Sequence, residues 1–313
     1  MIRDSGPTEH DGPDEEARAA ANLRGILFMI GAAAAFAVGD TIMKLLAGTV
    51  PTSELILIRG IFVFGGAIVA AYVMGAFAVL HRALTGAMAL RAAGDTGGAW
   101  CFQLALARMP YSDLSAIGQL TPLTITAASA LIFRERVGWR RWTATAIGLM
   151  GVLLIIRPGS STFNWWAIAG VGAVLASTTR DLATRRVDPT VPPPIITMLS
   201  SGLTVVTSLF VSLSATWVAP PLWVVGGLFC AAIFSLLGQS CTIIAVRSGD
   251  ISAVVPFRYA IIIFAIVSGI FVFGHFPDPL TLTGIVIVCT AGLYTFYREQ
   301  TLRRIAAATG ARK

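Results

Sequence analysis

The stretch DISAVVPFRYAIIIFAIVSGIFVFG, residues 250–274, is apolar and long enough to cross a lipid bilayer, yet it contains an arginine. About 20 apolar residues span the hydrocarbon core, and insertion scales put the cost of a central arginine at about 2.5–3.5 kcal/mol. Pro256, just before Arg258, removes a backbone hydrogen-bond donor and is expected to break the helix. A broken membrane helix that carries a buried cation is typical of a site that binds an anionic group.

The composition of the whole chain predicts a polytopic membrane protein. Its 313 residues are 56% hydrophobic and 12% charged, against about 25% charged in an ordinary soluble domain. The net charge of +7 comes largely from basic residues in short polar stretches beside apolar segments, a pattern that reports membrane topology and argues against nucleic-acid binding. The four cysteines lie in apolar segments without paired spacing, so we expect neither disulfides nor a zinc site, and no cofactor.

Ten apolar segments can be placed along the chain, which predicts an all-α membrane protein with ten transmembrane helices. Residues 1–22 are too polar to bury a core and start without a secretory signal, so we expect a disordered cytoplasmic tail there and a second tail at 299–313. Arg91 and Asp95 make the third segment the least regular. The segments are 23–46, 54–75, 84–107, 112–133, 142–157, 163–181, 194–215, 222–246, 251–274 and 279–297.

The placement of lysine and arginine predicts the orientation. With the amino terminus in the cytoplasm, most basic residues fall on the cytoplasmic side, and the other side keeps only Lys44, Arg108 and Arg157. We therefore expect a multi-pass protein of the inner (plasma) membrane with both termini cytoplasmic.

An internal repeat is visible when the halves are superimposed. DTIMK at 40–44 and DLATR at 181–185 lie 141 positions apart, each at the end of a segment. The alternative is chance similarity among apolar helices. Two repeats of five spans, 23–158 and 159–298, insert with opposite orientation because five is odd, and inverted repeats flank a central site. The acidic and basic ends of both pentapeptides have i,i+4 spacing and predict intrahelical ion pairs.

The order of residues over about 23–298 resembles the drug/metabolite transporter superfamily, in its EamA-like branch. This resemblance implies ten helices, inverted repeats and a central substrate cavity lined by helices from both halves. The residues that carry it are Gly39, Lys44, Arg59, Pro122, Arg134, Glu135, Arg136, Trp142, Gly148, Arg157 and Pro158.

A narrower resemblance lies in the second half. PFRY at 256–259, FPD at 276–278, Thr281 and Gly284 resemble the bacterial S-adenosylmethionine uptake proteins and the related riboflavin uptake group. Asp95, among small residues, departs from the bulkier apolar run of the S-adenosylmethionine proteins. The resemblance implies S-adenosylmethionine uptake first, with riboflavin uptake, or export of amino acids and their derivatives, as alternatives.

Arg258 and Asp95 are the first candidates for substrate contact. The planar guanidinium of Arg258 suits a carboxylate or phosphate, and the alternative is a structural ion pair, most simply with Asp95. Asp95 is expected to bind a substrate cation or a coupling proton, or to pair with Arg91 one turn earlier. Tyr259 offers a stacking ring or a hydroxyl donor, with ordinary aromatic packing as the alternative.

Four further candidates have equally plain structural alternatives. Arg59 is expected either to line an outer vestibule or to extend toward the membrane surface. Gln119 and Gln239 are uncharged amides that either bind substrate or join helices. Trp100 either stacks on a ligand or packs. Pro122 is a second expected helix break, beside Pro256.

Enzyme signatures are absent from the sequence. The histidines, His10, His81 and His275, lie far apart, and no phosphate-binding glycine-rich loop with lysine occurs, so neither a metal site nor ATP-driven transport is expected. A membrane-embedded enzyme or scaffold is the competing class. The expected partners are a small-molecule substrate, the lipid bilayer and a coupling proton or counter-substrate, and nothing in the sequence indicates an oligomeric state.

Overall fold

The computed structural model describes residues 12–132, 139–157, 164–214, 216–248 and 251–310, and over these residues it is helical without a strand. Arg134, Glu135, Arg136 and Pro158, which contribute to the family resemblance, lie outside the described residues, as do the first eleven residues of the expected tail.

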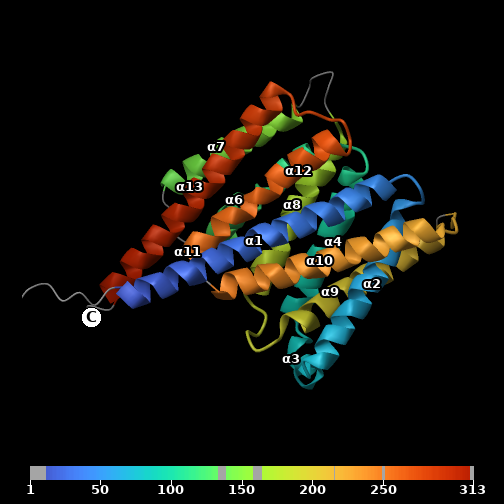
Figure 1. Ribbon diagram of the computed structural model, residues 1–313, viewed down its shortest axis with the longest axis horizontal. Coiled ribbons are helices and arrows are strands. Elements are labelled where there is room, and N and C mark those ends of the chain that lie inside the picture. The colour runs from blue at the N-terminus through green and yellow to red at the C-terminus, as the bar shows by residue number, and fades with distance from the viewer. Residues whose placement is uncertain (1–11, 133–138, 158–163, 215, 249–250, 311–313) are drawn as a thin grey trace, which may run out of the picture.

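The helices follow the apolar segments of the sequence (Figure 1). Their order is α1 (Gly12–Leu46), α2 (Thr52–Val73), η1 (Ala76–Val79), α3 (Leu80–Ala83), α4 (Gly86–Leu106), α5 (Tyr111–Gly118), α6 (Thr121–Ile132), α7 (Trp139–Ile156), α8 (Trp166–Thr184), α9 (Pro193–Ser214), α10 (Leu222–Ser248), α11 (Ile251–Val254), η2 (Val255–Tyr259), α12 (Ala260–Phe271) and α13 (Pro279–Gly310).

Two of these helices extend beyond the expected segments, and a third is more regular than expected. Helix α4 runs unbroken through Arg91 and Asp95. Helix α1 already begins at Gly12, within the stretch expected to be a tail, and α13 continues to Gly310. Alanine, glutamate and arginine, which dominate both extensions, are strong helix formers, and a helix anchored by a membrane span needs no new nucleus to extend.

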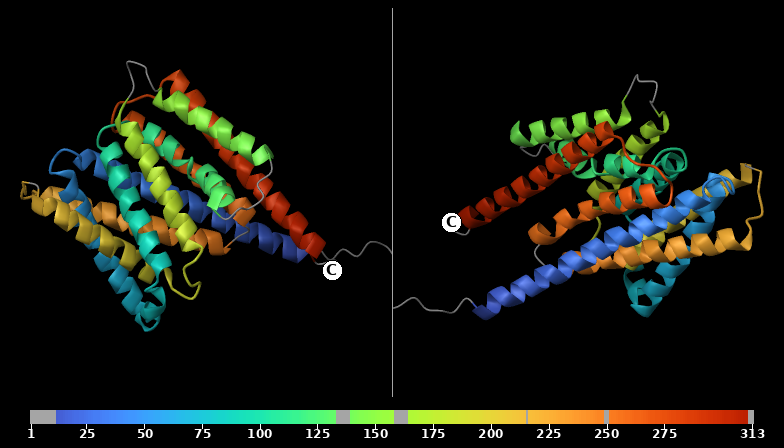
Figure 2. Two further views of the ribbon diagram at one scale, coloured as in Figure 1. Left: turned by 180° about the vertical axis from the view of Figure 1, so that it is seen from behind. Right: turned by 45° about the horizontal axis from the view of Figure 1, so that its top comes forward.

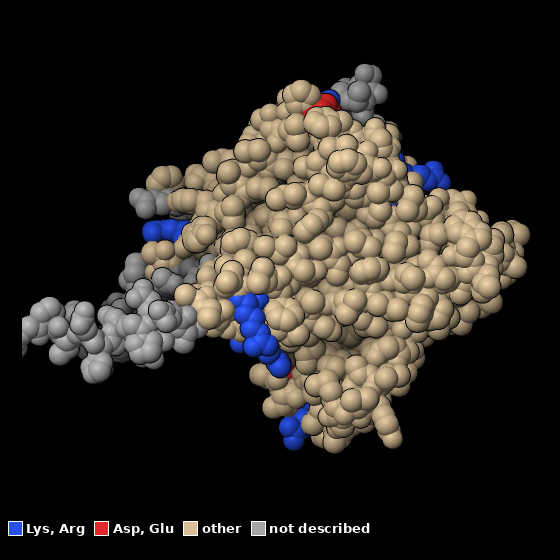
Figure 3. Space-filling view, viewed as in Figure 1, with Lys and Arg blue, Asp and Glu red and all other residues tan. Residues whose placement is uncertain are grey.

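The structure is that of a multi-pass membrane protein. Among the described residues, six helices are long and apolar enough to cross a membrane, and 142–156 and 255–271 form shorter apolar helices. Many large apolar side chains point outward, including Leu222 and Phe271, which are 87% and 82% exposed. Figure 3 shows a face with few charged side chains, most of them basic. Lipid tails, and not water, suit such a surface.

Helix α1 begins and helix α13 ends at the same end of the helix bundle (Figures 1 and 2). We call the half of the bundle at this end the terminal half and the other the opposite half. Helices α8, α10 and α13 run toward the terminal end, whereas α12 runs away from it (Figure 1). These directions place every site described below.

The helices pack in pairs that join the two halves of the sequence. The main pairs are α1 with α10, α4 with α8, α2 with α9, and α7 with α13. Small residues permit the closest approaches: a Cβ atom on Gly94 would lie 2.8 Å from the Ala176 carbonyl oxygen, and one on Gly284 would lie 2.7 Å from that of Gly151. Close backbone approach of this kind is a common basis of membrane-helix packing.

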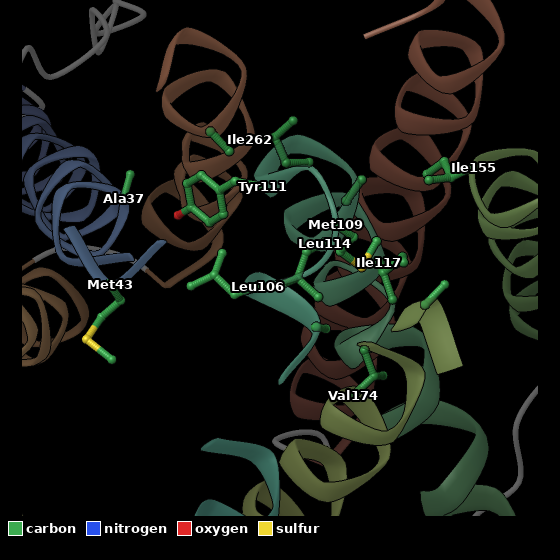
Figure 4. Packing of buried hydrophobic residues seen from close by; sticks show 14 of the residues in the cluster. Ala37, Met43, Leu106, Met109, Tyr111, Leu114, Ile117, Ile155, Val174 and Ile262 are labelled. Carbon is green, nitrogen blue, oxygen red and sulfur yellow. The ribbon is translucent and has the colours of Figure 1, made fainter. Parts of the chain in front are cut away.

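The largest buried cluster lies where α1, α5, α8 and α12 meet. Tyr111, only 1% exposed, is among its largest side chains. Figure 4 shows the Tyr111 ring between Ile262 of α12 and Ala37 of α1, with its hydroxyl toward α1. The core therefore includes residues from both halves of the chain.

Candidate functional site

A cavity of about 210 Å³ lies in the terminal half. Two of its lining elements place it there. Segment η2 lies at the start of α12, which runs away from the terminal end, and Phe296 lies in the second part of α13, which runs toward that end. The described residues that line it are Gln119, Thr121, Pro122, Ile125, Thr126, Ser129, Arg185, Val255, Pro256, Arg258, Tyr259 and Phe296.

Two interrupted helices meet at this cavity. Between α5 and α6 the backbone tightens, with the Gln119 and Leu120 N–H groups donating to the carbonyls of Ala116 and Ile117 at 3.1 and 3.0 Å. Pro256 lies within the 3₁₀ segment η2, between α11 and α12. Broken membrane helices are tolerated where the backbone borders a cavity or is satisfied by side chains, and the Thr121 hydroxyl donates to the Gly118 carbonyl at 2.7 Å.

Arg258 is the cation of this cavity that lacks a fixed partner. Its side chain is exposed to the cavity. In the described part of the chain it makes no ion pair or hydrogen bond, and it interacts with Asp181 and Arg180 only through space. The expected alternative, an ion pair with Asp95, is not formed. A guanidinium with unused donors at the edge of a cavity is suited to bind a carboxylate in a two-pronged arrangement.

Tyr259 lines the cavity beside Arg258, and its ring extends into space left by a glycine of α13. Its hydroxyl is buried without a hydrogen-bond partner. A Cβ atom on Gly292 of α13 would overlap that hydroxyl, so the absence of a side chain at Gly292 leaves room for the ring. An unpartnered hydroxyl at a cavity wall can donate to a ligand.

The sequence analysis missed most of the α6 contribution to the cavity. Pro122, Ile125, Thr126 and Ser129 line it with the spacing of one helical face. The recurrence of hydroxyl side chains at these positions of an apolar segment was the signal available in the sequence. Arg185 and Phe296 also line the cavity, and no comparable pattern marks either of them in the sequence.

Asp95 lies outside the cavity lining, in an ion pair across helices. Its Oδ1 is 3.2 Å from Arg180 Nη1 on α8, and Arg180 Nε is 2.8 Å from Asp181 Oδ1. Arg91 is not hydrogen-bonded to Asp95 but donates to Ser200 Oγ at 2.6 Å. Asp95 is therefore joined to a second helix by charge, and the cavity lining described here contains no carboxylate.

Two of the three remaining candidates, Arg59 and Gln239, make contacts between helices. Arg59 Nη2 of α2 donates to Ser235 Oγ of α10 at 2.5 Å. Thr197 of α9 donates to Gln239 Oε1 of α10 at 3.0 Å. Trp100 is half-buried on α4. None of these three lines the cavity, whereas Arg258, Tyr259, Gln119 and both prolines do.

The opposite half is held together by polar contacts. Lys44 Nζ, near the end of α1, donates to the carbonyls of Leu106 and Met109 at 2.8 and 2.7 Å, beyond the end of α4, and lies 5.4 Å from the Phe273 ring centroid. Cations are favoured at helix carboxyl termini. Thr41 shares a hydrogen bond with Ser268 of α12 at 2.7 Å.

Asp278 supplies another contact of the opposite half. Its carboxylate pairs with Arg157, which follows α7. The N–H group of Thr281 donates to it at 2.9 Å. This backbone hydrogen bond first, and Arg157 after it, hold the pKa of the exposed Asp278 carboxyl below its ordinary value. The pair therefore stays charged at neutral pH.

The two predicted i,i+4 ion pairs are not formed. Asp40 accepts a hydrogen bond from the Tyr111 hydroxyl at 3.1 Å, and Lys44 is engaged by carbonyls. Asp181 pairs with Arg180, and Arg185 donates to Ser129 Oγ at 3.4 Å. The prediction was wrong because partners on other helices, and for Asp181 the adjacent Arg180, compete with the residue one turn away.

A second, smaller cavity of about 160 Å³ lies in the opposite half. It is lined by α5, the end of α7, the start of α8 and the segments next to them, with Asp113 and Asn164 as its polar residues. Over the described residues, no group of three or more His, Cys, Asp and Glu side chains is placed to hold a metal ion.

Known proteins share this sequence pattern and this arrangement of helices. A profile of the EamA-like transporter family matches residues 23–157. This part of the chain, less than half of its length, is similar to that family. An S-adenosylmethionine uptake transporter of Rickettsia bellii is 26% identical over 64% of the chain and 68% of its own length, and a riboflavin transporter of Vibrio cholerae is 29% identical over 66% and 69%.

Two further comparisons extend over more of this EamA-like protein. A pseudopaline exporter of Pseudomonas aeruginosa is 24% identical over 85% of the chain and 95% of its own length. A solved crystal structure superposes with a TM-score of 0.61 at 17% identity, over 89% of this chain and 97% of that one. This chain therefore shares the fold of that solved structure across both of its halves.

Proposed function

We propose that this EamA-like protein is a secondary transporter that moves a small carboxylate-bearing metabolite across the inner membrane by alternating access. The observation that carries the proposal is the cavity between two helix breaks, with the unpaired Arg258 at its wall. Paired breaks at corresponding places of two halves are the best pointer to a transport site. The similarity of the chain to transporters supports this class.

The packing supports the proposed inverted repeats. If α1 corresponds to α8, α4 to α10 and α6 to α12, then the pair α1–α10 corresponds to α8–α4, and α1–α12 to α8–α6. In each of these four pairs, the two helices are packed against each other. Under the same exchange, the α5–α6 break corresponds to the η2 break. We infer ten transmembrane segments in two halves that can move against each other about this shared site.

The conformation described here corresponds to one of the two states of such a cycle. The cavity lies in the terminal half, and polar contacts hold the opposite half closed. With both termini in the cytoplasm, as the basic residues suggest, this is the state closed to the outside. Opening to the outside would require Lys44 to leave the carbonyls of Leu106 and Met109.

S-adenosylmethionine uptake is the first candidate activity, supported by the relatives with that name and by the resemblance of residues 256–259. Its carboxylate would bind Arg258, and its adenine would stack on Tyr259 or Phe296. The structure does not place Asp95 where we expected it to meet the substrate cation. The sulfonium and ammonium groups would therefore be met by the hydroxyl and amide groups of Gln119, Thr126 and Ser129.

Two alternatives remain from the same site. A riboflavin ring system would use the aromatic wall and the amide of Gln119, with less need for Arg258. Export of an amino acid derivative is favoured by the basic lining of the cavity, and by the exporter that aligns over 85% of the chain. A substrate with more than one carboxylate would suit this lining better than a cationic one.

The decisive experiment is uptake of labelled S-adenosylmethionine into proteoliposomes, with riboflavin, methionine and S-adenosylhomocysteine as competitors. Saturable uptake inhibited by S-adenosylhomocysteine alone supports the first candidate. Arg258→Ala should strongly reduce uptake at unchanged abundance, whereas the exposed Arg108→Ala in the opposite half should not. If folded protein takes up no S-adenosylmethionine but binds riboflavin, the first alternative replaces it. An enzyme or scaffold would keep its function in Arg258→Ala.

A further inference from the structure

Asp40 is a carboxylate within the membrane whose partner in the structure is a neutral group. It lies on α1, half-buried, in the opposite half. Its Oδ2 accepts a hydrogen bond of 3.1 Å from Tyr111, whose ring is almost fully buried. A carboxylate without a contact ion pair is costly inside a membrane and marks a functional position by default.

The other carboxylates of the membrane interior are held differently. Asp95 and Asp181 both contact Arg180, at 3.2 and 2.8 Å. Protonation of either would leave a buried guanidinium short of a counter-charge, which is unfavourable. Glu54 accepts a hydrogen bond from the Val218 N–H at 2.9 Å and is fully buried at the start of α2. Asp40, Glu54 and Asp113 can each gain a proton without breaking an ion pair described here, and of the three only Asp40 is bonded to a side chain of another helix.

The surroundings of Asp40 connect it to the rest of the bundle. Arg59 of α2 acts on it through space, and Arg59 is in turn influenced by Asp95. From α10 only the neutral Ser235 reaches this group, through Arg59. From α12, Ser268 bonds to the adjacent Thr41. On α1 itself, Lys44 is occupied by carbonyls, and Arg258 of η2 acts on Asp181 instead.

These contacts form an alternating series of charges between Asp40 and the cavity. The series runs from Asp40 to Arg59, Asp95, Arg180, Asp181 and Arg258, with each member acting on the next. It crosses α1, α2, α4, α8 and η2. The series therefore connects Asp40, through charges on successive helices, with the guanidinium that faces the cavity.

We propose that Asp40 is the proton-binding site that couples transport to a proton gradient. This inference rests on the proposed transport function. A proton from solution binds the carboxylate and turns the charge-assisted hydrogen bond with Tyr111 into a neutral one, which is roughly half as strong. That weakens the contact between α1 and α5 in the opposite half, and it leaves Arg59 with less opposing charge. Proton binding thus favours opening of the opposite half.

The first test needs no substrate. Infrared difference spectra of the purified parent protein between alkaline and acidic buffer report carboxyl groups that gain a proton. We expect a protonated-carboxyl absorption that is missing in Asp40→Asn and present in the control Glu54→Gln. If the parent and Asp40→Asn give the same absorption change, the proposal is overturned. Circular dichroism and thermal unfolding identify a variant that has merely failed to fold.

The second test uses labelled S-adenosylmethionine in proteoliposomes. A pH gradient should accelerate uptake by the parent and by Glu54→Gln but not by Asp40→Asn, while Asp40→Asn keeps exchange of internal for external substrate. Uptake by Asp40→Asn that still responds to the gradient contradicts the proposal. If the parent transports no S-adenosylmethionine, the substrate assignment fails, and the infrared result alone decides the role of Asp40.

Discussion

The two halves of the helix bundle use their polar residues in contrasting ways. In the terminal half, Arg258 faces a cavity and the hydroxyl of Tyr259, which also lines it, is buried, both without a partner in the described chain. In the opposite half, Lys44 and Asp278 are engaged by carbonyls, N–H groups and a guanidinium. The comparison teaches that charge alone does not identify a site in a membrane protein. A site is identified by side chains that lie beside a cavity and have hydrogen-bonding groups without a partner.

Of the substitutions that test this contrast between the two halves, replacement of Arg258 is expected to have the largest effect, on the rate of transport. Replacing it by alanine removes a charge-assisted hydrogen bond to the substrate worth about 1.5–3 kcal/mol, so transport should fall about tenfold to a hundredfold. Arg258→Lys should recover only part, because an ammonium cannot form the two-pronged contact. Initial uptake rates at matched abundance measure this, and equal rates for Arg258→Lys and the parent would refute the two-pronged geometry.

Lys44 is expected to give the next largest effect, on closure of the opposite half. Lys44→Met leaves the carbonyls of Leu106 and Met109 without their donor, at a cost of about 1–3 kcal/mol. Thermal unfolding in detergent should show the loss, and hydrogen exchange should rise around 106–109. The control is Arg24→Ala on the same helix, where the guanidinium is exposed and lies near Phe28. Unchanged exchange in Lys44→Met would mean that these contacts do not close the opposite half.

Gly292→Ala should disturb the cavity without a change of charge. The added methyl group overlaps the Tyr259 hydroxyl and forces the ring to turn. An off-rotamer side chain costs about 0.5–1.5 kcal/mol, so we expect a several-fold rise in the half-saturating substrate concentration. Gly65→Ala, whose added Cβ would meet no atom within 4 Å, is the matched control. Equal transport constants in both variants would place Tyr259 outside the substrate path.

The smallest effect is expected from the ion pair of Asp278 with Arg157. The Asp278 side chain is 50% exposed, and solvent-exposed pairs contribute about 0–1 kcal/mol. Because the Thr281 N–H lowers its pKa, Asp278 stabilises the opposite half at neutral pH. That contribution is lost only as the pH falls below the ordinary aspartate value of 3.8.

Hydrogen exchange over 273–281 in Asp278→Asn and the parent tests this pH dependence. The difference between the two proteins should be constant from neutral pH down to mildly acidic pH and disappear in strong acid. The control is Asp188→Asn, because Asp188 accepts a similar N–H hydrogen bond, from Thr190 at 2.8 Å, beyond α8 on the terminal side. If the difference in hydrogen exchange between the two proteins disappears near neutral pH, a group other than Asp278 controls the pH dependence of residues 273–281.

The sequence alone determined the class of protein and the approximate course of its helices. Apolar runs of about 20 residues force a membrane-spanning helix, because lipid offers the backbone no other hydrogen-bond partner. The expected segment 84–107 and α4, Gly86–Leu106, differ by only a few residues. Pro256 marked the broken helix and Arg258 the unusual charge for the same reason. A proline and an arginine each raise the free energy of a membrane-spanning helix. That effect can be inferred from the sequence without knowledge of the neighbouring helices.

The tertiary structure alone decided which polar residues share a site. Asp95 and Arg258 looked alike in the sequence, as charges within apolar segments, but only Arg258 faces the cavity, whereas Asp95 meets Arg180 on another helix. The predicted pairs of Asp40 with Lys44 and of Asp181 with Arg185 failed similarly. Spacing along one helix fixes which side chains can meet one turn apart. Whether they do depends on the partners that neighbouring helices bring, and only the packed bundle sets those.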